Sequence, residues 1–278
     1  MGNTVAKRKP KGDCIMIKAI FFDIDGTLLS HQSGSVPAST RESIRQLKEQ
    51  GIKIFAATGR HMLQLEKLPV KGLPFDGYVT LNGQICMDAN KAILYEAPIE
   101  PGDTEKMTEI FKQMALPVMV IEQNRMYINF VDSMVEEAQK AISTPVPEIG
   151  VYTGEKVYQY IAYGKEECVQ SLAARLSDCK MTKWNPYGFD IIPKQGGKVA
   201  GIRQILKYFG IGEDEIMAFG DGGNDTDMLR FAAIGVAMGN ADEAVKQQAD
   251  YVTSHIDQDG IWQALKHYGI VYKNFFLS

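Results

Sequence analysis

The chain has 278 residues, of which 45% are hydrophobic and 23% are charged, and this length allows one large domain or two smaller ones with an ample core. The formal net charge of -4 gives no global field that would favour nucleic acid or an anionic membrane as a partner. No apolar run approaches the roughly 20 residues that span a bilayer, and the cysteines are scattered without a C-x-x-C pair, so we expect a cytoplasmic globular protein. Residues 1–15, which are basic and contain Gly and Pro, are expected to form a disordered leader.

The first predicted element is a buried strand over residues 19–22, followed by Asp23 and Asp25. Residues i and i+2 of an extended segment point the same way, so the two acids should face one site. Gly26 and Thr27 follow at once and turn the chain. Two carboxylates without a local basic partner are costly to ionise, which favours a hard, oxygen-seeking cation such as Mg²⁺ beside them.

Two further strands follow, with helices between them. A helix is predicted from about residue 40 to residue 50, and a buried strand over residues 52–57 ends at Thr58. A short helix and a third strand over residues 78–81 come next, closed by an Asn-Gly turn. The alternation of strands and helices predicts a doubly wound parallel sheet of the α/β class, in which ligands bind at the carboxyl ends of the strands.

Residues 84–189 differ from the rest and are expected to form an inserted α+β cap domain, with residues 16–83 and 190–278 forming the core domain. The strands expected in the insertion cover residues 92–95, 117–121, 126–130 and 158–162, and the helices 103–114, 133–142 and 165–177. This pattern indicates a mixed sheet with helices on one face. The insertion contains no D-x-D pair, histidine cluster or Gly-rich phosphate loop, so we expect it to determine specificity and not to carry the chemistry.

The doubly wound pattern returns with an amphipathic helix over residues 198–209 and a strand over residues 215–219, which ends in the sequence GDGGND at residues 220–225. Lys198 begins the helix, where a cation opposes the helix dipole, so an anion is expected opposite it. A dinucleotide fingerprint needs a third glycine where this run has Asp225. The Gly-Gly-Lys segment also lacks the earlier glycine and the Ser or Thr of a P-loop.

Polar residues therefore stand at the carboxyl ends of three predicted strands. They are Asp23 with Asp25, Thr58, and Asp221 with Asp225. Four acids with few cations call for a metal ion and for an anionic ligand bridged by it. Phosphate is the natural candidate, because Gly-rich turns and helix N-termini bind it through backbone N–H groups. A solvated turn remains the alternative for each motif taken alone.

The order and spacing of these motifs resemble the four motifs of the haloacid dehalogenase (HAD) superfamily. The matching segments are Asp23-Ile24-Asp25-Gly26-Thr27, Thr58-Gly59-Arg60, Lys198 and Gly220-Asp221-Gly222-Gly223-Asn224-Asp225. The insertion between the second and third motifs resembles the Cof-type branch, mostly phosphatases of sugar phosphates and other small phosphate esters. Val199 departs from the family pattern, in which a glycine often follows the motif lysine. This departure affects only how the chain enters the helix, because the lysine itself is kept.

The resemblance implies a division of roles. Asp23 would be the nucleophile that forms an aspartyl-phosphate, and Asp25 would be the general acid and base. Mg²⁺ would be held by the Asp23 carboxylate, the Asp25 backbone carbonyl and the Asp221 carboxylate. The residues that would bind the phosphoryl group or the substrate are Thr58, Gly59, Lys198 and Asn224. Asp225 would orient a metal-bound water or Lys198.

These roles predict a Mg²⁺-dependent phosphatase that acts on a small phosphorylated metabolite, such as a sugar phosphate. Two alternatives stay open: a phosphomutase of the same superfamily and a catalytically quiet metabolite-binding module. The sequence also leaves open the oligomeric state and the surroundings of Arg60 and His61, which either face the insertion or lie at a solvated helix start.

Overall fold

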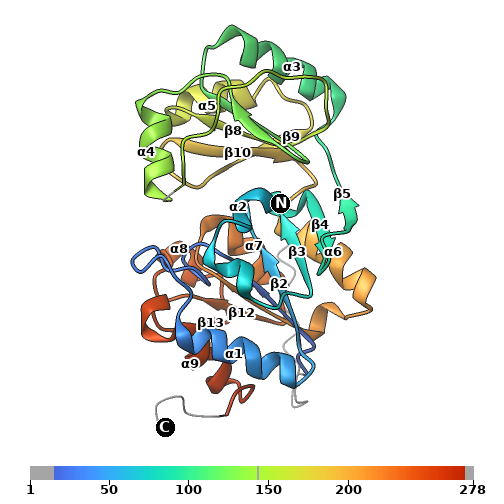
Figure 1. Ribbon diagram of the computed structural model, residues 1–278, viewed down its shortest axis with the longest axis vertical. Coiled ribbons are helices and arrows are strands. Elements are labelled where there is room, and N and C mark those ends of the chain that lie inside the picture. The colour runs from blue at the N-terminus through green and yellow to red at the C-terminus, as the bar shows by residue number, and fades with distance from the viewer. Residues whose placement is uncertain (1–15, 143, 273–278) are drawn as a thin grey trace.

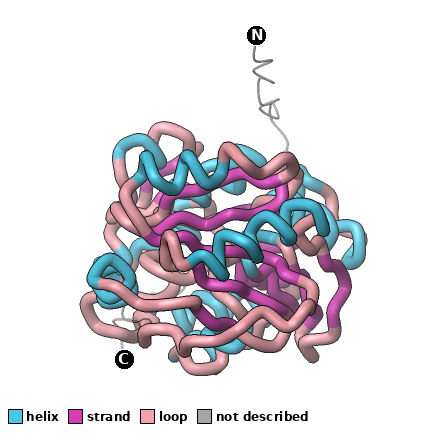
Figure 2. The backbone as a smooth tube through the Cα atoms, turned by 90° about the horizontal axis from the view of Figure 1, so that it is seen from above, coloured by secondary structure: helices cyan, strands magenta, loops and turns pink. Residues whose placement is uncertain are grey.

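Two β-sheets, one above the other, organise the molecule (Figure 1). The computed structural model describes residues 16–142 and 144–272, so the leader predicted at residues 1–15 lies outside the described residues. The lower sheet belongs to the core domain and the upper sheet to the inserted domain, which is called the cap below. Figure 2, which views the molecule from above, shows helices running across the strands of the cap.

The core sheet has eight strands in the order β13-β12-β11-β1-β2-β3-β4-β5. Their bounds are β1 Ala19–Phe22, β2 Lys53–Ala57, β3 Gly77–Thr80, β4 Ile85–Asp88, β5 Ile93–Glu96, β11 Ile216–Gly220, β12 Ile234–Ala237 and β13 Tyr251–Val252. All pairs from β13 to β3 are parallel, whereas β3–β4 and β4–β5 are antiparallel. The predicted doubly wound parallel sheet is thus confirmed, with an antiparallel edge added to it.

Helices cover both faces of the core sheet, as expected for a parallel sheet. They are α1 Ala38–Glu49, α2 Met62–Leu65, α6 Lys198–Phe209, α7 Thr226–Phe231, α8 Glu243–Lys246 and α9 Gly260–His267. Alternate residues of β1 point to opposite faces: Ile20 and Phe22 join the apolar cluster of α1 and α9, while Phe21 joins that of α6 and α7. Each such fully buried side chain stabilises the fold by about 1.5–3 kcal/mol.

The cap is built on a five-stranded antiparallel sheet in the order β7-β6-β8-β10-β9. Its elements are α3 Pro101–Gln113, β6 Val118–Glu122, β7 Met126–Ile128, α4 Ser133–Ala141, β8 Val157–Tyr163, α5 Glu166–Ala173, β9 Cys179–Lys183 and β10 Gly188–Pro193. Helices α3 and α5 lie over the outer face of the sheet (Figure 1). The other face looks toward the core domain.

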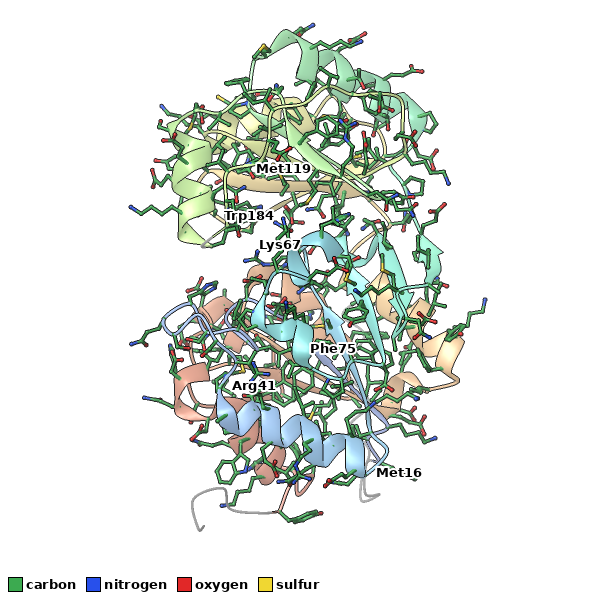
Figure 3. The ribbon with its side chains drawn as sticks, viewed as in Figure 1. Met16, Arg41, Lys67, Phe75, Met119 and Trp184 are labelled. Carbon is green, nitrogen blue, oxygen red and sulfur yellow. The ribbon has the colours of Figure 1, made fainter. Side chains whose placement is uncertain are left out.

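Alternation along the cap strands decides which residues reach the core domain. In β6, Val118 and Val120 pack under the helices, whereas Met119 points the other way and lines the cavity between the two domains. In β10, Ile191 packs under the helices and Asp190 lines the cavity. Figure 3 shows Met119 and Trp184 on the side of the cap that faces the core. The cap therefore forms the roof of the cavity.

The predicted domain boundaries need correction in two places. The strand expected in the insertion at residues 92–95 is β5, which pairs with β4 in the core sheet, so residues 85–96 extend the core and do not belong to the cap sheet. At the other end, β10 runs to Pro193 within the cap sheet and crosses the predicted boundary at residue 190.

None of the helices in the described ranges has the length and apolar character needed to cross a membrane.

Candidate active site

Three adjacent parallel strands, β11, β1 and β2, end at the same edge of the core sheet. Asp221 follows β11, Asp23 follows β1 and Thr58 follows β2. These side chains come from distant parts of the chain, yet all three line one cavity of about 250 Å³ under the cap. The carboxyl-end rule for parallel sheets therefore places the predicted motifs together.

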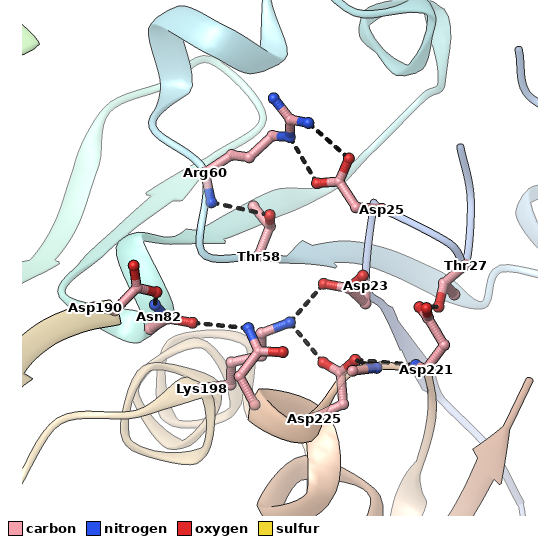
Figure 4. Close-up of polar contacts among 12 residues, drawn as sticks. Asp23, Asp25, Thr27, Thr58, Arg60, Asn82, Asp190, Lys198, Asp221 and Asp225 are labelled. Atoms are coloured by element: carbon pink, nitrogen blue, oxygen red, sulfur yellow. Dashed lines mark hydrogen bonds and ion pairs between the residues drawn. The ribbon is translucent and has the colours of Figure 1, made fainter. Parts of the chain in front are cut away.

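Lys198 lies between two buried carboxylates (Figure 4). Its Nζ donates to Asp23 Oδ1 at 2.5 Å and to Asp225 Oδ1 at 2.6 Å. Burial raises the pKa of Asp23 well above its usual value; the Asp225 carboxylate adds to this shift and Lys198 opposes it. Burial alone would lower the pKa of Lys198, but the two carboxylates outweigh it and raise that pKa. These contacts explain a lysine at the first residue of α6.

Asp225 is fully buried and has both carboxylate oxygens engaged. Besides the contact of Oδ1 with Lys198, Oδ2 accepts from the backbone N–H groups of Asp221 at 3.0 Å and Gly222 at 2.9 Å. Asp225 thus holds two things in place: the ammonium group of Lys198 and the loop that carries Asp221.

Asp221 is held from two directions. Thr27 Oγ1 donates to Asp221 Oδ1 at 2.7 Å, and Asn240 Nδ2 donates to Asp221 Oδ2 at 3.3 Å. Gly26, at φ +79°, lies against the same carboxylate, where an added Cβ would stand 2.1 Å from Oδ2. Burial and the Asp225 charge raise the pKa of Asp221 to about 7.

The acidic side chains fit a divalent cation. Single carboxylate oxygens of Asp23, Asp221 and Asp225 lie within 4.8 Å of one another, and hard cations such as Mg²⁺ take oxygen ligands only. Asp225 is fully buried, whereas Asp23 and Asp221 line the cavity, so these two carboxylates are the ones that an ion in the cavity can reach. Burial raises the pKa of both acids most and the Asp225 charge raises it further. A cation beside them would oppose these shifts, because it favours the ionised carboxylates.

Asp25 turns away from this cluster, toward Arg60 (Figure 4). Arg60 Nε donates to Asp25 Oδ2 at 2.6 Å and Arg60 Nη2 donates to Asp25 Oδ1 at 2.8 Å. The guanidinium also reaches the cap, where Nη1 donates to Thr144 Oγ1 at 2.9 Å. Arg60 is buried, so of the two possibilities that the sequence left open, it faces the insertion.

Thr58, Gly59 and Asn224 line the cavity on the side of Lys198. Thr58 Oγ1 accepts from the Arg60 backbone N–H at 3.1 Å, and its own hydroxyl hydrogen remains available to a ligand oxygen. Asn224 Nδ2 donates to Asn82 Oδ1 at 3.2 Å. All the residues predicted for the site thus surround one cavity or directly support its walls.

A second polar contact joins core and cap at Asn82. Its Nδ2 donates to Asp190 Oδ2 at 2.7 Å and to Gln159 Oε1 at 3.3 Å, both on cap strands. Burial raises the pKa of Asp190 to about 7, although the bond from Asn82 opposes this shift. His61 makes another contact, since its Nε2 lies 3.1 Å from the backbone oxygen of Glu122. His61 is therefore also buried against the cap.

Sequence reasoning assigned no role to several residues that shape the site. Thr27 stands inside the first motif and could have been suspected from its hydroxyl alone. Asn82 follows a predicted strand, the same signal that marked Thr58. Asp190 lies in a segment, residues 189–193, that resembles the Cof-type branch, but the resemblance gave it no role. Asn240 carried no signal, because its contacts depend on how distant segments pack.

Comparison with known proteins agrees with this geometry. The family model described as haloacid dehalogenase-like hydrolase matches residues 20–265. The chain belongs to the haloacid dehalogenase-like hydrolases. A putative phosphatase of Bacillus subtilis, YkrA, is 30% identical over 91% of this chain and 98% of its own. Together with the solved relatives below, it supports a phosphatase of this superfamily.

Two solved structures are similar over nearly their whole length. The phosphatase BT1666 of Bacteroides thetaiotaomicron is 33% identical, with a TM-score of 0.85 over 94% of this chain and 98% of its own. BT4131, a sugar phosphatase of HAD subclass IIB, is 37% identical, with a TM-score of 0.82 over 91% of this chain and 100% of its own. The HAD-like hydrolase described here thus shares its core and cap with phosphatases.

Proposed function

We propose that this HAD-like phosphatase hydrolyses a small phosphorylated metabolite with the help of Mg²⁺ and through an aspartyl-phosphate on Asp23. The observation that supports this most is the placement of Asp23 and Asp221 at the floor of one cavity, with Asp25 on its wall. Lys198 Nζ lies 2.5 Å from Asp23 Oδ1 beside that floor. A binding module would have no need of a second acid beside a buried carboxylate and ammonium pair.

The nucleophile is the Asp23 carboxylate, which attacks phosphorus while the bond to the ester oxygen breaks. Asp25 in its carboxylic acid form gives a proton to the leaving alkoxide. In the second half, the Asp25 carboxylate takes a proton from the water that attacks the phosphorus of the aspartyl-phosphate. Phosphate leaves and Asp23 is regenerated, so atoms and protons balance over the two steps.

The other residues bind and orient. Thr58 Oγ1 and Lys198 Nζ contact phosphoryl oxygens and offset negative charge during transfer. The Gly59 backbone and Asn224 complete the phosphate-binding side of the cavity. The Asp23 and Asp221 carboxylates and the Asp25 backbone carbonyl would hold Mg²⁺, which neutralises phosphoryl charge when bound. Asp225 holds Lys198 and the Asp221 loop in place.

The cavity size and its roof support a small substrate. The volume of about 250 Å³ leaves room for a phosphoryl group and a leaving group of a few heavy atoms beyond it. The roof mixes apolar side chains, such as Met119 and Trp184, with the polar groups of Gln139 and Asp190. A compact hydroxylated leaving group suits this mixture, and the solved relative BT4131 is itself a sugar phosphatase.

The test is phosphate release from a panel of sugar phosphates, polyol phosphates and nitrophenyl phosphate. We expect turnover with Mg²⁺, loss in EDTA, recovery when Mg²⁺ is restored, and no turnover by Asp23→Asn. Isomerised product without phosphate release, dependent on a bisphosphate activator, would instead identify a phosphomutase. Binding without any turnover across the panel would contradict both enzymes.

A further inference from the structure

Arg60 stands at the only place where one described side chain contacts both Asp25 and the cap. Its guanidinium holds the Asp25 carboxylate through two parallel bonds, from Nε at 2.6 Å and from Nη2 at 2.8 Å. Such a bidentate pair fixes the carboxylate in direction as well as in position. Within residues 16–142 and 144–272, no other group donates a hydrogen bond to either Asp25 oxygen.

The opposite edge of the same guanidinium contacts the cap segment that follows α4. Nη1 donates to Thr144 Oγ1 at 2.9 Å, and Nη2 donates to the Ile142 backbone oxygen at 3.2 Å. An arginine has five N–H donors, and these contacts engage one on Nε, two on Nη2 and one on Nη1. Arg60 is 8% exposed, so little of it is left to bind a substrate anion.

We propose that Arg60 is a positioning residue that couples docking of the cap to the orientation of Asp25. When the cap is docked, Ile142 and Thr144 fix one edge of the guanidinium, and its other edge then fixes the acid. When the cap moves away, Arg60 loses two of its acceptors and Asp25 loses a rigid partner. The direction of the Asp25 carboxylate, which lines the cavity, is thus fixed only while the cap is docked. This inference rests on the acid and base role proposed for Asp25.

His61, the next residue, provides a cap contact that does not involve Arg60. Its Nε2 lies 3.1 Å from the Glu122 oxygen and 3.0 Å from the Gln123 oxygen, and its Nδ1 accepts from the Leu63 N–H. His61 therefore also docks the cap, at the turn between β6 and β7, but none of its contacts involves Asp25. A change at His61 weakens docking without removing the partner of the acid.

The experiment compares kcat/KM for two esters, because kcat/KM covers only the steps up to formation of the aspartyl-phosphate. Nitrophenyl phosphate has a leaving group that departs without protonation, whereas the alkoxide of glycerol phosphate needs a proton from Asp25. For Arg60→Gln, we expect kcat/KM to fall about 100-fold with glycerol phosphate, the usual size of a general-acid contribution, and less than about fivefold with nitrophenyl phosphate. A burst of nitrophenol should also appear, since Asp25 serves the later water step as well.

Two further variants complete the test. Thr144→Val removes one hydrogen bond from the cap side and should lower kcat/KM about fivefold with glycerol phosphate alone, the effect of an ordinary hydrogen bond. His61→Ala leaves Arg60 in place but loosens the cap, so the coupling predicts a larger loss of kcat/KM with glycerol phosphate than with nitrophenyl phosphate, smaller than the loss in Arg60→Gln. Equal losses for both esters in Arg60→Gln, or no loss in Thr144→Val, would overturn the coupling while leaving the phosphatase intact. A wild-type protein that cleaves neither ester would refute the proposed function itself.

Discussion

Replacing Lys198 by Met gives the sharpest test of the electrostatics of the site. The ammonium group of Lys198 lies within 2.6 Å of two carboxylates, and its side chain is 1% exposed, like that of Asp225. Methionine keeps most of the length and apolar volume but removes the charge. Asp23 and Asp225 are then left largely buried without their cation.

The expected loss of unfolding free energy is about 3–5 kcal/mol at about pH 8 without metal, the range found when one partner of a buried ion pair is removed. The loss should shrink at lower pH. The pKa of Asp23 is already raised by burial, and without Lys198 it rises further, so the folded variant binds protons that the unfolded chain has released. Stability of the variant therefore falls as pH rises from about 4 through the folded-state pKa.

The assay is urea unfolding in EDTA, followed by far-UV circular dichroism at about pH 5.5 and pH 8. Lys18→Met is the matched control, because Lys18 pairs with Glu215 at a similar 2.6 Å but with 47% of its side chain exposed; it should cost at most about 1 kcal/mol at either pH. A loss below about 1 kcal/mol for Lys198→Met, or one independent of pH, would refute the reasoning.

Three other changes probe separate parts of the site. Asp25→Asn should lower kcat with an alkyl phosphate by about 10²–10⁴, measured by phosphate release, and unchanged turnover would remove its proposed role. Gly26→Ala should raise the Mg²⁺ concentration needed for half-maximal activity at least about tenfold, because the added Cβ would stand 2.1 Å from Asp221 Oδ2 and displace that carboxylate. An unaltered Mg²⁺ titration would contradict this expectation. Burial raises the pKa of Asp190 from 3.8 to about 7. Between these pH values the folded protein keeps Asp190 protonated while the unfolded chain releases the proton, so the stability of the wild type falls as pH rises through this range. Asp190→Asn should accordingly gain thermal stability relative to the wild type between about pH 5 and pH 8, and a constant difference in Tm would count against it.

The sequence located the floor of the site well because one rule of parallel sheets governs it. Acids and hydroxyls placed directly after buried strands must meet at the carboxyl edge once those strands are neighbours. Asp23, Thr58 and Asp221 follow that rule, and β11, β1 and β2 are indeed adjacent. The local sequence pattern was enough to predict this, because a residue's place after a parallel strand decides which edge of the sheet it occupies, whatever its side chain packs against.

The contacts between the domains lay beyond sequence reasoning. Strand β5 is a short apolar run, Ile93-Leu94-Tyr95, whose sequence suits either sheet, and it pairs with β4 in the core sheet. Arg60 has a long side chain whose direction depends on its acceptors, Asp25 and the segment after α4, which lie 35 and more than 80 positions away in sequence. Asn82 and Asp190 meet for a similar reason, across 108 positions.

The identity of the nucleophile is the central claim, and trapping of the intermediate tests it directly. Asp25→Asn is mixed with nitrophenyl phosphate and Mg²⁺, quenched in acid and digested, and the peptides are mapped by mass spectrometry. We predict one phosphoryl group on the peptide that contains Asp23, removable by hydroxylamine as an acyl phosphate is, and its absence in the Asp23→Asn, Asp25→Asn double variant. A phosphoryl group on another residue, or full turnover by Asp23→Asn alone, would contradict the account.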